Sequence, residues 1–156
     1  MRLRRARLAV MMAALSAAIV MSSLKVGAQP SNAEAQPSLK DEVYLTVSLV
    51  QIGKTSNERS IAAQLLCELT RGNASRQVDD PSLDSIIALL DSDDDSVRYW
   101  VALCLGNFGP RAKAATPKLL KIVDQTDCVK ASKTSASAAR VTLKRIGAEV
   151  PSSKCK

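Results

Sequence analysis

Residues 97–109 read VRYWVALCLGNFG, and their apolar and small side chains follow the period of an α-helix with one apolar face. The same pattern occurs 39 positions earlier, in residues 58–70, and 38 positions later, in residues 135–147. The aligned positions include Val101 with Ala62 and Ala139, and Leu105 with Leu66 and Leu143. Three copies of one amphipathic helix predict an internal repeat.

A second apolar helical pattern precedes each copy. Residues 80–90 (DPSLDSIIALL) begin with Asp80, which suits a helix cap, and Pro81, which suits the first turn. A single helix pair has one apolar face and cannot bury it alone, so the pairs must stack. The sequence therefore predicts an all-α protein, a short α-solenoid of three helix pairs at about residues 41–71, 80–108 and 112–147.

The middle pair resembles the HEAT repeat, in the bacterial variety shared with phycobilisome-lyase-type proteins. The matching stretches are residues 89–98 (LLDSDDDSVR), Ala102, Leu105-Gly106, Phe108-Gly109-Pro110, Ala112 and Ala115-Thr116-Pro117. The resemblance covers about residues 41–150 and implies a solenoid whose second helices line one face. It also implies that Arg59, Asp91 and Arg98 bridge neighbouring repeats. Ala136 replaces the arginine in the third repeat, so we expect the bridging to end there.

The first 28 residues have the layout of a secretory signal peptide. A basic start, MRLRRAR, precedes an uncharged run from Leu8 to Met21, and small residues lead up to Ala28. A membrane anchor is the alternative, but this run spans about 21 Å, less than the roughly 30 Å of a bilayer core. We expect cleavage near Ala28 and a periplasmic or secreted protein. A disordered spacer (29–40), the repeat domain (41–150) and a C-terminal tail (151–156) would follow.

Composition narrows the classes of function. The chain has 22 Lys and Arg against 15 Asp and Glu, but five of the bases and none of the acids lie in residues 1–28. The remainder has 17 bases against 15 acids, and it has few aromatic residues. Nucleic acid is therefore not an expected partner. Histidine is absent, as are glycine-rich phosphate loops and nucleophile turns, so we expect no enzyme, cofactor or metal site.

The remaining charge is unevenly distributed along the chain. Residues 29–110 hold 6 bases and 12 acids, whereas residues 111–156 hold 11 bases and 3 acids. Two interpretations stay open for the basic end. It either docks an anionic partner or membrane surface, or forms a solvated cap of the solenoid.

The acidic run at residues 91–95 (DSDDD) suggests calcium at first sight. A calcium loop of the EF-hand type needs Gly at its sixth position and Glu at its twelfth, where this chain has Ser96 and Ala102. Negative side chains also stabilise the start of a helix. We therefore expect Asp93 to cap the following helix, with the next two aspartates in its first turn.

The four cysteines fall into two pairs, neither with the spacing of a zinc or redox motif. Cys67 and Cys104 lie inside second helices, out of register by two positions, and are expected to be buried as small apolar residues. Cys128 lies in an insertion of the third pair and Cys155 in the tail. An exported compartment is oxidising, so we expect a Cys128–Cys155 disulfide, with two free thiols as the alternative.

Tyr99 and Leu103 occupy positions that are usually polar in this type of repeat. They share one face of the helix, and Val141 aligns with Leu103 in the next repeat. With Trp100 at the edge, these residues are expected either to bind a partner protein or to be partly buried. The sequence thus predicts a non-catalytic protein-interaction module with an unidentified protein partner. The alternatives are an electrostatic adaptor for an anionic partner or membrane surface, and an accessory subunit of an exported enzyme.

Overall fold

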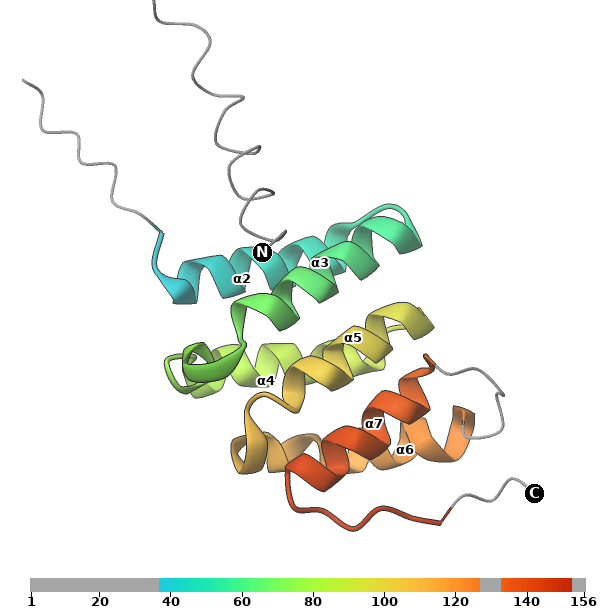
Figure 1. Ribbon diagram of the computed structural model, residues 1–156. Coiled ribbons are helices and arrows are strands. Elements are labelled where there is room, and N and C mark those ends of the chain that lie inside the picture. The colour runs from blue at the N-terminus through green and yellow to red at the C-terminus, as the bar shows by residue number, and fades with distance from the viewer. Residues whose placement is uncertain (1–36, 127–132, 153–156) are drawn as a thin grey trace, which may run out of the picture. The chain divides into compact units, whose positions relative to one another are not determined.

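The computed structural model describes residues 37–126 and 133–152, and every regular element in them is helical (Figure 1). The α-helices form three consecutive pairs, which confirms the all-α architecture predicted from the sequence. The pairs are α2 (Leu39–Ile52) with α3 (Ser56–Leu69), α4 (Asp80–Ala88) with α5 (Asp95–Leu105), and α6 (Thr116–Thr126) with α7 (Ser135–Arg145). The 3-10 helices η1 (Gly72–Arg76) and η3 (Gly109–Ala115) connect the pairs, and η2 (Leu89–Asp91) lies between α4 and α5.

The helices form two layers. The second helices α3, α5 and α7 lie side by side in one layer, and α2, α4 and α6 form the other (Figure 1). Contacts between neighbouring second helices are extensive, whereas α2 touches α4 at few points. The layer of first helices is therefore more open than the layer of second helices.

Capping boxes set where three of the described helices begin. Ser38, Thr55 and Thr134 each form a capping box, in which the hydroxyl accepts the backbone N–H three residues on. The box at Ser38 starts α2 two residues before the expected boundary at residue 41. Residues 38–40, assigned from the sequence to the spacer, therefore belong to the first repeat.

Two predicted caps are wrong by one residue. Asp94, not Asp93, precedes α5 with extended backbone, and its carboxylate accepts the Ser96 N–H at 2.9 Å. In the same way Asp79, not Asp80, caps α4. The residue type alone cannot show which of several adjacent aspartates is the cap, because the cap is the residue whose backbone leaves the helical conformation.

One continuous apolar core joins the three pairs. The largest fully buried side chains come from five helices: Leu66, Ile86, Leu105, Leu119 and Leu143. Leu66, Leu105 and Leu143 occupy the same position in α3, α5 and α7. The core is thus built by stacking equivalent faces.

The cysteines inside second helices are buried, as predicted. Cys67 is 7% exposed and Cys104 is 0% exposed. Cys128 and Cys155, with their expected disulfide, lie outside the described residues, and so do residues 1–36. None of the described helices combines the length and apolar character that a membrane span requires.

Candidate functional site

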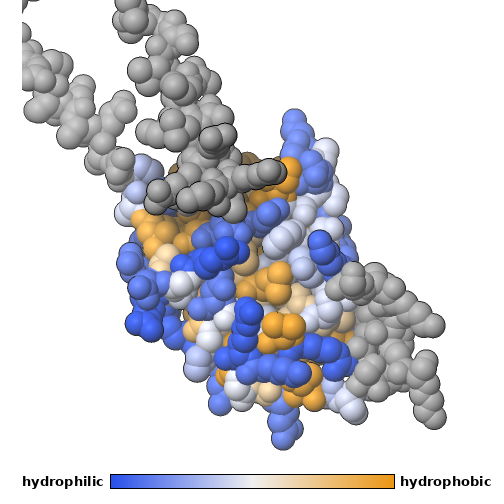
Figure 2. Space-filling model, viewed as in Figure 1, coloured by the Kyte–Doolittle hydropathy of each residue, from blue (hydrophilic) through white to orange (hydrophobic). Residues whose placement is uncertain are grey.

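The predicted partner-binding residues lie on the outer side of the second-helix layer. Tyr99 and Trp100 stack edge to face with ring centroids 5.2 Å apart, and with Leu103 they are partly buried against the core. Val141 on α7 is 43% exposed. In Figure 2, which views this layer, hydrophobic patches are interrupted by hydrophilic side chains. Tyr99, Trp100 and Leu103 thus fit the partial burial that the sequence left open, and Val141 is the exposed member of the set.

The residues expected to bridge repeats take part in three links. The Arg59 guanidinium contacts the Asp94 carboxylate at 3.2 Å, which joins α3 to α5. Asp91 accepts a 2.7 Å bond from the Lys118 ammonium of α6. Arg98 stays within its own repeat, where it binds Asp95 at 3.0 Å and the Ser92 carbonyl at 2.6 Å.

Asp95 extends the link of Arg98 into the third repeat. Its carboxylate accepts the hydroxyl and, more weakly, the backbone N–H of Ser135, next to the Ala136 that replaces arginine. A serine hydroxyl of the third repeat thus joins α7 to the start of α5 at this junction.

Further buried polar bonds join the second helices near their C-terminal ends. The Thr142 hydroxyl of α7 donates to the Ala102 carbonyl of α5 at 2.6 Å, and both residues are 0% exposed. Cys104 lies 3.1 Å from the Thr70 hydroxyl, and burial raises the pKa of its thiol to about 12. These groups connect repeats, and the buried Cys104 thiol stays protonated at neutral pH.

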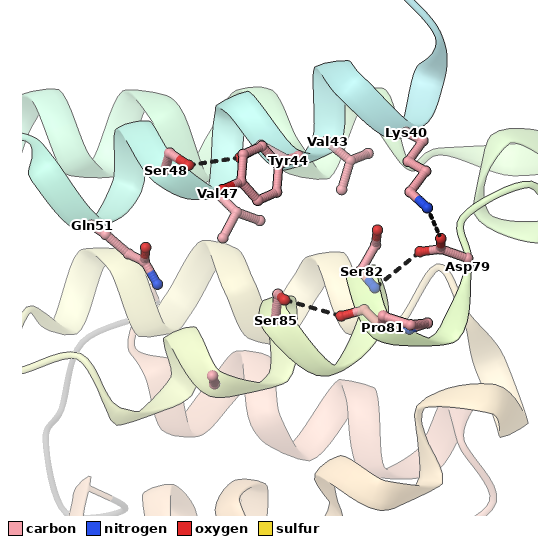
Figure 3. A pocket seen from close by; sticks show the side chains of 11 residues that line it. Lys40, Val43, Tyr44, Val47, Ser48, Gln51, Asp79, Pro81, Ser82 and Ser85 are labelled. Carbon is pink, nitrogen blue, oxygen red and sulfur yellow. Dashed lines mark hydrogen bonds and ion pairs between the residues drawn. The ribbon is translucent and has the colours of Figure 1, made fainter.

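A concave site lies in the other layer, between α2 and α4 (Figure 3). This groove is a cavity of about 380 Å³. Val43 and Val47 form its apolar floor, where they are largely covered at 0% and 5% exposure, and Tyr44, which is 69% exposed, stands on its rim. The remaining lining residues are Lys40, Ser48, Gln51, Asp79, Pro81, Ser82, Ser85 and Ala88.

An ion pair closes one end of the groove. The Lys40 ammonium lies 2.7 Å from the carboxylate of Asp79, which also accepts the Ser82 backbone N–H at 3.0 Å (Figure 3). The bond from Lys40, followed by those from Ser82, lowers the pKa of Asp79 to about 2. The same carboxylate raises the pKa of Lys40. Both groups therefore stay charged across the physiological range.

The hydroxyl groups of the groove are oriented as acceptors. Ser48 donates its proton to the Tyr44 carbonyl and Ser85 donates to the Pro81 carbonyl, each at 3.0 Å (Figure 3). A hydroxyl that donates to its own helix still has oxygen lone pairs that can accept. The groove can thus accept N–H donors above an apolar floor.

Sequence reasoning missed this groove. The sequence predicts Val47, Leu49 and Val50 on the apolar side of the first helix; Val47 and Val50 are buried, whereas Leu49 is 50% exposed. The groove above Val47 depends on the spacing of α2 and α4. No residue pattern encodes that spacing. Comparison of the chain with protein-family models, with curated protein sequences and with solved structures finds no match.

Proposed function

We propose that this protein is an exported, non-catalytic interaction module of HEAT-like repeats, which holds an extended segment of a partner protein in the groove between α2 and α4. The observation that carries this proposal is the groove itself, with its apolar floor, exposed tyrosine and acceptor hydroxyls. A peptide fits such a site because its side chains bury apolar surface while its backbone N–H groups find acceptors. Tyrosine is a frequent anchor at protein interfaces.

The ionisable groups of the groove support a binding role. A general acid or base works best with a pKa near the operating pH. The pKa of Lys40 is raised and that of Asp79 is lowered, so both values move away from neutral pH and each group keeps its charge. Both thus suit orientation of a ligand. Residues 29–110 hold twice as many acids as bases, which favours a neutral or basic segment.

A blocking variant tests the location of the site. Ser85→Arg places a long side chain in the groove and removes only the bond to Pro81. Val141→Arg is the matched control, since it adds the same charge and bulk to the second-helix surface. A peptide selected from a displayed library against the unmodified protein serves as the probe. We expect Ser85→Arg to abolish its binding and Val141→Arg to leave the affinity unchanged, measured by calorimetry.

The reverse result would refute the groove and place docking on the surface around Tyr99 and Leu103. Salt separates both locations from the electrostatic alternative, because apolar docking survives high ionic strength and surface-charge binding does not. A peptide released by salt, and also by Lys121→Glu on the basic α6, would favour an adaptor for anionic partners. Analysis of the mature N-terminus after expression tests export, which predicts a chain beginning near Gln29.

A further inference from the structure

The first repeat leaves an apolar surface on the side away from the rest of the solenoid. Its large apolar residues, which we call the end face, are Leu45 (57% exposed), Leu49 (50%), Ile52 (71%), Ile61 (57%) and Leu65 (47%). Leu45, Leu49 and Ile52 recur at helical spacing on α2, and Ile61 and Leu65 lie one turn apart on α3. The end repeat of a solenoid normally has a polar outer face.

The positions on α3 match those that join repeats elsewhere in the fold. Leu65 aligns with Cys104 on α5 and Thr142 on α7, both 0% exposed. Cys104 contacts the Leu66 carbonyl of the preceding repeat, and Thr142 donates to the carbonyl of Ala102 in the repeat before it. The end face is therefore an inter-repeat surface with no preceding repeat in the described chain.

The opposite end of the array is closed by its own chain. After α7, Ala148 and Val150 pack partly buried against the core, and an Arg140 N–H donates to the Pro151 carbonyl. This segment after α7, residues 146–152, runs along the end of the solenoid farthest from α2 (Figure 1). Because it covers part of the last repeat, it disfavours head-to-tail stacking, in which the end face of one copy meets the last repeat of another.

We propose that the end face is the interface of a two-fold symmetric dimer, formed with the same face of a second copy of this chain. An isologous interface needs a surface that complements itself, which an apolar face can do. Each of the five exposed residues offers on the order of 100 Å² of accessible surface, so the face offers about 500 Å² per copy. Two copies bury about 1,000 Å² before the flanking side chains are counted, which is the threshold of a specific interface.

The charges around the end face fit this arrangement. Asp41 and Glu42 lie in the first turn of α2, and Lys54 follows its last turn. A two-fold axis near the middle of α2 makes the two copies of the helix antiparallel, so Lys54 of one copy approaches Glu42 of the other. Glu58 on α3 adds negative charge, whereas Glu68 is paired with Arg71 at 2.7 Å; the acidic groups Asp41, Glu42 and Glu58 disfavour an anionic membrane as the occupant.

Sedimentation equilibrium on the protein recovered from an expressing bacterium tests the dimer. We expect a concentration-dependent mass of two chains, and Leu49→Glu should raise the dissociation constant by about tenfold or more. Val141→Glu is the matched control, because Val141 is similarly exposed on α7, and it should leave the dimer intact. Circular dichroism checks that both variants keep the helical fold.

A charge exchange tests the antiparallel geometry. Lys54→Glu should weaken the dimer by bringing like charges together, and adding Glu42→Lys should restore it. The proposal is overturned by a wild-type protein that stays monomeric at all concentrations, or by a dimer that Leu49→Glu leaves unchanged. Binding of the monomer to neutral lipid vesicles through the same residues would also overturn it. None of these variants alters the groove residue Ser85, so the dimer and the peptide site are tested separately.

Discussion

The link between Arg59 and Asp94 makes a quantitative prediction about how the repeats are coupled. Asp94 has two roles, because one carboxylate oxygen caps α5 and the other contacts the arginine of α3 at 3.2 Å. Its side chain is 6% exposed and that of Arg59 is 27% exposed. Asp94→Asn keeps an oxygen for the cap and removes the charge, whereas Asp94→Ala removes both functions.

The expected losses follow from these two roles. A charge-assisted hydrogen bond at a partly buried site contributes about 1–2 kcal/mol to the free energy of unfolding. Removing an aspartate cap costs about 1 kcal/mol more. We therefore expect Asp94→Asn to lose about 1–2 kcal/mol and Asp94→Ala about 2–3 kcal/mol. Urea unfolding followed by circular dichroism measures both.

The dependence on pH gives an independent check of the same link. Burial by itself raises the pKa of Asp94, but bonds from Ser56, Ser96, Val97 and Arg59 outweigh it and lower the pKa below 3.8. A carboxyl group with a lowered pKa stabilises the fold at pH values above its ordinary pKa. This contribution is lost as the pH falls through the pKa of the folded state. The gap in stability between wild type and Asp94→Asn should thus narrow as the pH drops below 3.8.

Asp93 provides the matched control. It is the neighbouring aspartate, its side chain is 95% exposed, and it lies 3.9 Å from the same arginine. Such an exposed contact contributes little, so Asp93→Asn should cost less than about 0.5 kcal/mol. Equal losses from Asp93→Asn and Asp94→Asn would refute the assignment of the link.

Three further predictions concern other contacts. Thr142→Val removes the buried hydrogen bond to the Ala102 carbonyl and should lower the free energy of unfolding in urea by about 1 kcal/mol. Thr142→Ser keeps the hydroxyl and should lose less of that bond's contribution. Because burial raises its pKa to about 12, the Cys104 thiol should react with an alkylating reagent at neutral pH only after unfolding. Rapid labelling of the native protein at this position, seen by peptide mass spectrometry, would contradict this. Lys40→Met should raise the pKa of Asp79 from about 2 toward its ordinary value, and an unchanged carboxyl titration by NMR would argue against the ion pair.

The sequence alone determined the helices and their pairing. Periodic apolar residues such as Leu66, Leu105 and Leu143 indicated which faces are buried, and the structure places all three at 0% exposure. Periodicity succeeds here because each repeat contacts only its neighbours, so a local pattern is enough to specify the fold. Burial of Cys67 and Cys104 followed from the same pattern.

Polar partners were decided only by the tertiary structure. The sequence indicated Asp93 as the cap, yet Asp94 fills that place and also receives Arg59. Which of three adjacent aspartates meets an arginine 35 residues away depends on backbone directions to within one residue. A helical period leaves that offset undefined.

The two proposed surfaces also depend on the stacking. Val47 and Leu49 are both apolar residues of α2, and a linear pattern treats them alike. In the structure Val47 lines the groove beside α4, whereas Leu49 is half exposed on the end face. The difference arises because a neighbouring repeat stacks on only one side of the first one. An apolar pattern thus predicts that a face needs a partner, and the packing of the three repeats decides which faces remain without one.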